Sequence, residues 1–552
     1  MKTNPNVLFV NLLTLPLDDV MDVFNLKSIR TQSVNMPMGI LYLSSAIKKA
    51  DCVGKVGIID YVLELTDSGS YSDMDAFIEG VAKKSAHFEP DVLAFSLNFS
   101  ASHAFFIRTF NALHKMWPEA VTIAGGVHAS NIARHLFHEI DIEYVACGEC
   151  ENSLVDFLKE LRESSDVDIK GIYSRKKLPV AGHIEPVSFV EDLDVLAFPD
   201  WGLIDMDRYI VSLGRQRDIG KVQKHASLIT TRGCYFRCTF CSAHTVHGRT
   251  MRLRSAENVL EEMQSLYDRY GITLFMPEDD LFTANKQRVL DLLAAIKEMQ
   301  IPDLEMQFPA ALSVNTLDES LIDALMGAGM RILVLAIESG SAFVQKNVIK
   351  KNCDIIKARR LANYAKSKGL LVRCYFILGF PTETKEQMRE TVEYAKTLQV
   401  DWCVFNIATP LVGSEMYNQF VEMGCIRDCS DAWASTVFDR RQFDTKDISA
   451  DELNDFVYRA NLECNFLHNP NIISGAYVKA IDLFQDIVRK HPFHIIAWYC
   501  IWMCFRKIKD ENESMRIEGV MTDLIKNDER AKDMLVKYRD LMIDLPGHVF
   551  LQ

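Results

Sequence analysis

The sequence predicts an α/β protein with three folded parts: an N-terminal doubly wound parallel sheet, a central (β/α)6 partial TIM barrel and a C-terminal α-helical domain. Short apolar runs alternate with amphipathic stretches in two series, one before about residue 165 and one from about residue 224. Runs rich in Val, Ile, Leu and Phe without polar alternation are typical of strands covered on both faces. Beyond about residue 445 the pattern becomes helical.

The first series, within residues 1–165, contains five expected strands: 6–13, 55–60, 91–99, 120–126 and 142–148. Apolar residues at helical spacing follow in 39–50, 75–88, 104–117 and 151–163. A doubly wound sheet of this kind, Rossmann-like in topology, binds ligands at the carboxyl ends of its strands. Those ends carry "SLNFSAS" (96–102), "AGGVHAS" (124–130) and "CGECEN" (147–152). Gly125, Gly126 and Gly148 would let a ligand approach the backbone closely, although tight turns also explain glycines.

A linker is expected over residues 166–223, because prolines and carboxylates occur there without sustained periodicity. Residues 224–445 hold the second series. A row of six strand–helix units favours a barrel or an open partial barrel, whose chemistry lies at the strand carboxyl ends. The six expected strands are 225–233, 272–277, 304–309, 330–339, 370–380 and 401–410.

The stretch "TRGCYFRCTFCSAH" (231–244) follows the first strand of that series. It places Cys234, Cys238 and Cys241 at C-x3-C-x2-C spacing, with no fourth cysteine nearby. Three thiolates can hold three irons of a four-iron cluster and leave the fourth iron open to a small molecule. Structural zinc normally takes four protein ligands and would need His244, His247 or a distant cysteine. The spacing favours the open cluster, with a zinc site or three buried structural cysteines as alternatives.

With Phe240 just before its last cysteine, this motif resembles the cluster motif of the radical S-adenosylmethionine (AdoMet) superfamily. Later segments are similar, in order, to those of the subgroup with an N-terminal cobalamin-binding domain. They are "RLRSAENVLEEM" (252–263), "EDDLFT" (278–283), "AIESGS" (336–341), "ILGFPTET" (377–384) and "ATPLVGSEMY" (408–417). Together with "PMGILYLSSAI" (37–47) and the two glycine turns, the resemblance covers roughly residues 5 to 420.

Three cofactors are implied by the resemblance. Cys234, Cys238 and Cys241 would ligate a [4Fe-4S] cluster, and AdoMet would bind the open iron through its amino and carboxylate groups. The resemblance places other residues near AdoMet: Phe240, Asp280, Glu338, Ser339 and Gly379. It places a third group near cobalamin: Gly125, Gly126, His128, Gly148 and Glu149. A strand-end turn is the alternative for Glu338 and Ser339, and a helix cap is the alternative for Asp280 and His128.

The loop after the first strand bears on the cobalamin prediction. It reads "NLLTLPLDDVMDVF" (11–24) and lacks the Asp-x-His-x-x-Gly motif that supplies a histidine to the lower face of cobalamin in some related domains. Bound cobalamin is therefore expected to have water, a vacant lower face or another side chain instead. Loss of the cofactor from the domain is the alternative.

The activity implied by the resemblance is reductive cleavage of AdoMet to a 5′-deoxyadenosyl radical, which removes hydrogen from an unactivated carbon. Methyl transfer to that carbon is the leading hypothesis. One alternative is a non-methylating rearrangement, cyclisation or oxidation with the same cofactors. Another is a cobalamin-binding sensor or scaffold without turnover. The expected partners are a small-molecule substrate, such as a natural product, lipid or tetrapyrrole, and a flavodoxin- or ferredoxin-type electron donor.

Composition and hydropathy limit which partners and which cellular location are expected for the protein. The chain has 61 Lys and Arg against 75 Asp and Glu, a net charge of −14, which offers no broad electrostatic footprint for nucleic acid. No apolar run is long enough to span a bilayer, and the N-terminus lacks the features of a signal peptide, so the protein is expected to be cytoplasmic. In the C-terminal part, 446–552, residues 476–492 and 495–505 resemble one tetratricopeptide-like helical hairpin.

Overall fold

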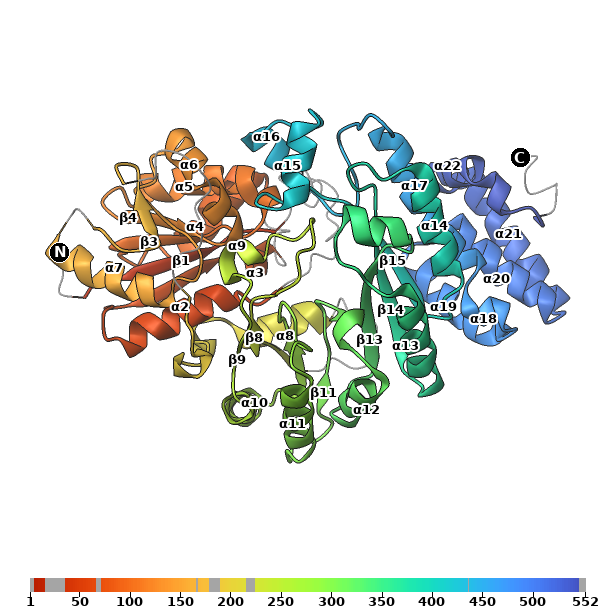
Figure 1. Ribbon diagram of the computed structural model, residues 1–552. Helices are drawn as coiled ribbons and strands as arrows, with labels where there is room; N and C mark the ends of the chain where they lie inside the picture. The colour runs from red at the N-terminus through yellow and green to blue at the C-terminus, as the bar shows by residue number, and fades with distance from the viewer. Residues whose placement is uncertain are drawn as a thin grey trace. The chain divides into compact units, whose positions relative to one another are not determined.

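The computed structural model describes residues 4–14, 35–65, 71–164, 167–177, 189–214, 224–434 and 436–545 (Figure 1). The chain divides into two compact units. The first comprises Met1–Leu312, Thr316–Arg331 and Thr409–Phe438, and the second comprises Ser313–Asn315, Ile332–Ala408 and Asp439–Gln552. The domain boundaries expected near residues 165, 223 and 445 stay predictions. Most of the loop at 11–24 and parts of the 166–223 linker lie outside the described residues.

A six-stranded sheet forms the N-terminal part of the first unit, in the order β2-β1-β3-β4-β5-β6. The five expected strands are confirmed and pair in parallel. They are β1 (Val7–Asn11), β2 (Val56–Asp60), β3 (Val92–Ser96), β4 (Val121–Gly125) and β5 (Tyr144–Ala146). The edge strand β6 (Ile172–Ser174), which pairs antiparallel with β5, lies where the sequence predicted a linker.

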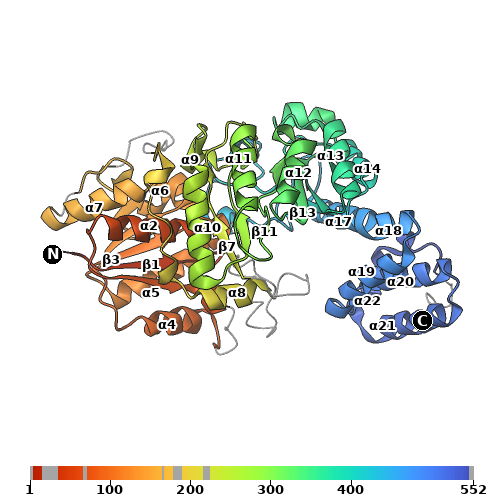
Figure 2. The same cartoon turned by 90° about the horizontal axis from the view of Figure 1, so that it is seen from below.

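Helices cover both faces of this sheet, as Figures 1 and 2 show. Because successive strand residues point to opposite faces, Val7 and Phe9 pack with one helix layer, and Leu8 and Val10 pack with the other. The first layer contains α2 (Met38–Lys49) and α7 (Glu151–Glu163). The second contains α4 (Met74–Lys84), α5 (His103–Met116) and α6 (Val127–Glu139), with α3 (Tyr61–Leu65) preceding it. The doubly wound architecture is thereby confirmed.

The rest of the first unit carries the start of the second strand–helix series. β7 (His225–Leu228), β10 (Leu274–Pro277) and β11 (Glu305–Met306) form a parallel sheet, and β8 (Thr231–Arg232) pairs antiparallel with β9 (Arg252–Leu253). The helices are α8 (Met206–Gly214), α9 (His244–His247), α10 (Ala256–Tyr270), α11 (Lys286–Lys297), α12 (Glu319–Gly327), α15 (Glu415–Glu422) and α16 (Ser430–Ala434). The two-residue strand β12 (Leu312–Ser313) spans the division between the units.

The second unit continues the series with three parallel strands: β13 (Ile332–Glu338), β14 (Leu371–Leu378) and β15 (Trp402–Ile407). α13 (Ile355–Ser367) and α14 (Lys385–Lys396) follow the first two of these strands. All six strands predicted for the central part are therefore present.

The C-terminal part of the second unit is helical, as predicted, and Figure 2 separates its helices well. They are α17 (Ala450–Leu462), α18 (Pro470–Ile473), α19 (Tyr477–Lys490), α20 (Ile495–Lys507), α21 (Glu511–Asn527) and α22 (Glu529–Lys537). The predicted hairpin is formed by α19 and α20, and Trp502 is buried in the core between the helices. Among the described residues, no helix has the length and apolarity that crossing a membrane requires.

Candidate functional site

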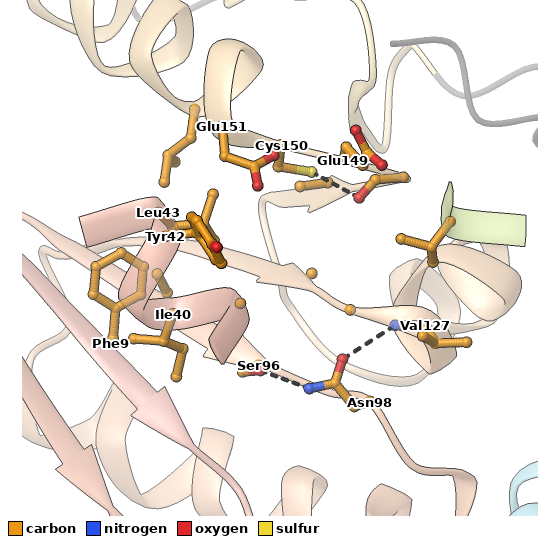
Figure 3. A pocket seen from close by; sticks show the side chains of 18 of the residues that line it. Phe9, Ile40, Tyr42, Leu43, Ser96, Asn98, Val127, Glu149, Cys150 and Glu151 are labelled. Atoms are coloured by element: carbon orange, nitrogen blue, oxygen red, sulfur yellow. Dashed lines mark hydrogen bonds between the residues drawn. The ribbon is translucent and has the colours of Figure 1, made fainter. Parts of the chain in front are cut away.

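A cavity of about 240 Å³ opens in the first unit where β3, β4 and β5 end (Figure 3). Its walls are mostly apolar and come from strand residues and from α2 and α7. The glycines Gly125, Gly126 and Gly148 form part of the lining. Other lining residues include Phe9, Ile40, Tyr42, Leu43, Ala94, Ile123, Ala146, Leu154, Ile229 and Val246. We call this cavity the glycine pocket.

Gly126 fixes the edge of the glycine pocket. Its φ is +107°, and a Cβ there would lie 2.5 Å from Asn98 Oδ1 and 2.7 Å from the Leu97 carbonyl oxygen. The Asn98 side chain accepts a hydrogen bond from the Val127 N–H at 3.3 Å and donates one to Ser96 Oγ at 3.0 Å, drawn in Figure 3. Only glycine suits this backbone conformation and this close approach.

Two carboxylates, a guanidinium and an imidazole line one side of the glycine pocket: Glu149, Glu151, Arg232 and His247. Arg252 contacts Glu149 from outside the lining, and we call the five residues together the rim. Glu149 is 5% exposed and accepts hydrogen bonds from both Nη atoms of Arg252, each at 2.6 Å. His247 Nδ1 lies 3.0 Å from the same carboxylate, and Arg232 Nη1 lies 3.4 Å away. Burial opposes ionisation, but the hydrogen bonds from His247 and Arg252 and the charge of Arg232 outweigh it and lower the pKa of Glu149 to about 2.

The second carboxylate of the rim, Glu151, is only partly satisfied. Its Oε1 accepts a hydrogen bond from Arg232 Nη2 at 2.6 Å. Its Oε2 is buried and has no hydrogen-bond partner among the described residues. Arg232 also lies over the ring of Tyr42 on α2, with 5.2 Å between the guanidinium carbon and the ring centroid. Glu151 thus lines the glycine pocket, while its Oε2 is shielded from the cavity.

His128 does not line the glycine pocket. It is 2% exposed on α6, with Nδ1 3.0 Å from Ser100 Oγ and Nε2 3.3 Å from His103 Nδ1. The rings of both histidines meet Trp433 of α16 edge-on. Burial, and then the neighbouring His103, lower the pKa of His128 well below its ordinary value, so the imidazole is neutral at pH 7.

The three motif cysteines lie on the segment that connects β8 to α9, and all three are half-buried. The Cys241 N–H donates to the Cys238 carbonyl at 3.3 Å, and the Cys234 N–H donates to the Gly248 carbonyl at 3.4 Å. Phe240 is also half-buried on this segment. In the described part of the chain, no three His, Cys, Asp or Glu side chains are grouped so that they could hold a single metal ion.

Gly233 begins this cysteine segment. Its φ is +88°, and a Cβ would lie 2.3 Å from the Thr250 carbonyl oxygen. Asp280, which was predicted to lie near AdoMet, accepts a hydrogen bond from the Gly233 N–H through Oδ2 at 3.0 Å. The neighbouring Asp279 is buried and accepts hydrogen bonds from the N–H and the hydroxyl of Thr230. Both aspartates thus hold the chain at the start of the cysteine segment.

Glu338 and Ser339 follow β13 in the second unit. Glu338 is buried with φ +70°, at an irregularity in the pairing of β13 with β14, and its Oε1 accepts a hydrogen bond from Lys351 Nζ at 2.7 Å. The hydroxyl of Ser339 is buried and lies 3.0 Å from Thr391 Oγ1. The sequence analysis missed Lys351, because no spacing rule links it to Glu338 across the intervening turn.

Gly379 lies at the end of β14 in the second unit. Its N–H and that of Phe380 donate to Glu383 Oε2 at 2.7 and 3.0 Å, and Arg441 donates to the Gly379 carbonyl. Burial raises the pKa of Glu383 to about 8, although the two backbone hydrogen bonds and the charge of Arg441 act against this shift. Glu383 and Arg441 were not predicted from the sequence, although Glu383 belongs to the quoted segment "ILGFPTET".

Comparison with known proteins gives two family matches. Residues 228–395 match the Radical SAM superfamily, and residues 29–158 match the B12 binding domain. An uncharacterized methyltransferase of Pyrococcus horikoshii is 30% identical over 393 residues, which cover 69% of this chain and 77% of that protein. Cytidylyl-2-hydroxyethylphosphonate methyltransferase of Streptomyces wedmorensis is 27% identical over 428 residues, covering 71% of this chain and 78% of that protein.

A solved structure shares the whole fold. The cobalamin-dependent AdoMet radical enzyme OxsB, with aqua-cobalamin and AdoMet bound, matches with a TM-score of 0.62. The match covers 99% of this chain and 82% of that chain at 15% sequence identity. At that identity, the likeness concerns the fold alone.

Proposed function

Since this chain belongs to the radical SAM superfamily and carries a B12-binding domain, we propose that it transfers a methyl group to an unactivated carbon of a small molecule. The cofactors of this enzyme class are a [4Fe-4S] cluster, AdoMet and cobalamin. Two relatives that the chain matches over more than two thirds of their length are named methyltransferases. That agreement supports methyl transfer over a non-methylating radical reaction.

The observation that carries the cobalamin part of this proposal is the glycine pocket. The pocket has an apolar wall and a glycine edge that brings backbone to its surface. An uncharged, flat base would fit the apolar wall. These features fit the nucleotide tail of cobalamin.

The cysteine segment fits a cluster with one open iron, because three thiols lie on one half-buried segment. When bound, the cluster supplies the electron that cleaves AdoMet, and cobalamin supplies the methyl group. The chain itself has to hold the loop, orient the substrate and exclude water. Asp280 serves the first task through its hydrogen bond to Gly233. Phe240 beside the cluster, and Glu338, Ser339 and Gly379 near AdoMet, are proposed on motif position alone.

The first test uses anaerobic protein reconstituted with iron, sulfide and cobalamin, with AdoMet that carries a deuterated methyl group. Reduced flavodoxin, the class of donor we propose, supplies electrons. We expect bound cobalamin, a [4Fe-4S] spectrum, 5′-deoxyadenosine and label that leaves AdoMet for a carbon acceptor in small-molecule extracts. Cleavage of AdoMet with no transfer of label to any acceptor would favour the non-methylating alternative.

A matched pair of variants tests whether the three-cysteine motif is required for the cluster and for AdoMet cleavage. Cys238→Ala should lose the cluster and 5′-deoxyadenosine formation while it retains cobalamin, because the glycine pocket does not include Cys238. Cys429→Ala removes a half-buried cysteine outside the motif and should keep both the cluster and 5′-deoxyadenosine formation. Equal iron content in the two variants would contradict the assignment of Cys238.

A further inference from the structure

The charged rim of the glycine pocket joins two separate stretches of the first unit. Glu149 comes from the turn between β5 of the six-stranded sheet and α7, and Glu151 is the first residue of α7. Arg232 and Arg252 come from the antiparallel ribbon of β8 and β9. Glu149 contacts both arginines, while Glu151 contacts Arg232. The rim is therefore an ionic connection between the sheet that forms the pocket and the ribbon.

The carboxylates of this connection stabilise the ribbon, because they offset two like charges on its paired strands. Arg232 and Arg252 are direct cross-strand partners, and both are nearly fully buried, at 4% and 5% exposure. Like charges placed opposite one another destabilise a strand pair. Here Glu149 lies within 3.4 Å of one guanidinium and 2.6 Å of the other, so one carboxylate attracts both cations, and Glu151 supplies the second negative charge. Without it, two buried cations would face each other with only Glu151 as counter-charge.

The cysteine segment is the connection between the two strands of this ribbon. β8 ends at Arg232, β9 begins at Arg252, and the three cysteines lie in the residues between them. Both ends of that connection are thus held by Glu149. Arg252 is further fixed by hydrogen bonds to the carbonyls of Val190 and His247, at 2.9 and 2.8 Å.

An occupant of the glycine pocket would touch both stretches. The lining includes Gly148 and Glu149 from the sheet, and Ile229, Arg232 and His247 from around the ribbon. It includes none of residues 233–243, which carry the cysteines. An effect of the occupant on those residues therefore passes through their flanks: Arg232 of the ribbon before them, and Val246 and His247 of α9 after them.

We propose that Glu149, Arg232 and Arg252 form a clamp through which an occupied glycine pocket fixes the position of the cysteine segment. These three are positioning residues, and the inference rests on the proposed function in so far as cobalamin is the occupant. Coupling between two binding sites is reciprocal. The cluster should therefore raise the affinity for cobalamin by the same factor by which cobalamin raises the affinity of the cysteine segment for the cluster.

Amide hydrogen exchange under anaerobic conditions tests the clamp, with and without saturating cobalamin. In the wild type we expect cobalamin to slow exchange in peptides covering 233–243 by about tenfold or more. In Glu149→Gln, which keeps the shape but removes the charge, we expect slowing within residues 35–164 but not within 233–243. Glu262→Gln is the control, because the buried pair of Glu262 with Arg254 does not line the glycine pocket; it should behave as the wild type.

A second measurement on the wild type needs no folded variant. The dissociation constant for cobalamin is measured before and after chelation of the iron, and we expect it to rise about tenfold when the cluster is removed. Bound cobalamin that leaves both 233–243 exchange and this constant unchanged overturns the clamp, even if methyl transfer is observed. If cobalamin and the cluster affect each other in these measurements but no labelled acceptor is found, methyl transfer is overturned instead. If the protein does not bind cobalamin, the clamp and methyl transfer are both overturned.

Discussion

Replacing Gly233 by alanine tests how the cysteine segment starts. The φ of +88° is a conformation that costs a non-glycine residue about 1–2 kcal/mol. The new Cβ would also lie 2.3 Å from the Thr250 carbonyl oxygen, well inside the 3.0 Å that real Cβ atoms respect. Since that oxygen is backbone, relief requires the segment itself to move. We expect the substitution to lower the free energy of unfolding by about 2–5 kcal/mol in total, because overpacking adds about 1–3 kcal/mol to the conformational cost.

The assay measures iron and sulfide per chain after anaerobic reconstitution, together with the thermal unfolding midpoint. Gly233→Ala should hold less than half of the wild-type iron and should still bind cobalamin. Gly519→Ala is the matched control: Gly519 lies within α21, nothing approaches its Cβ position within 4 Å, and alanine favours helix. Full iron loading and an unchanged midpoint in Gly233→Ala would refute the argument from φ and contact distance.

Three further substitutions have definite expected outcomes. Gly126→Ala should weaken cobalamin binding at least tenfold in an absorbance titration, because the φ of +107° and the 2.5 Å approach to Asn98 Oδ1 force the edge of the pocket to move. Lys351→Met should destabilise the second unit by about 3–5 kcal/mol in chemical unfolding, because it leaves the buried Glu338 carboxylate without its cation. Glu383 has a pKa of about 8 in the folded protein, above the ordinary 4.5, so the fold favours the neutral carboxyl group. Wild-type stability therefore falls as the pH rises from 6 to 9, and Glu383→Gln should flatten this decline.

Each of these substitutions has a control. Gly327→Ala, at the end of α12 and outside the glycine pocket, adds a methyl group where nothing lies within 4 Å and should keep cobalamin affinity. Lys346→Met and Glu390→Gln alter exposed side chains and should leave unfolding and its pH dependence unchanged. A cobalamin affinity equal to wild type in Gly126→Ala, a stable Lys351→Met, or parallel pH profiles for Glu383→Gln and wild type would each contradict its prediction.

Local patterns were sufficient to predict most of the fold. Both strand–helix series were visible because each buried parallel strand is a nearly unbroken apolar run bounded by glycine or polar residues. Strand β6 was missed because three residues with one buried side chain give no such signal. Its pairing depends on β5, which is distant in sequence and supplies the free edge.

In the candidate site, too, residues within one short motif could be predicted, whereas residues brought together from distant segments could not. Cys234, Cys238 and Cys241 could be proposed as cluster ligands from the sequence, because the whole motif lies within eight consecutive positions. Of the rim, the resemblance indicated only Glu149. Its partners Arg232 and Arg252 could not be predicted, since they come from a distant segment and look like ordinary surface charges in the sequence. His128 shows the opposite case: the resemblance placed it near cobalamin, with a helix cap as the alternative, and its ring is enclosed by Ser100, His103 and Trp433.

The charges of the rim also determine what the glycine pocket can accept. Two guanidinium groups and two carboxylates, all at most 6% exposed, neutralise one another, so they leave no surplus cation to attract a phosphate. The remaining wall is apolar, and a buried charge without a partner would be costly there. An uncharged aromatic base is therefore the part of a nucleotide that belongs inside, with its phosphate left outside.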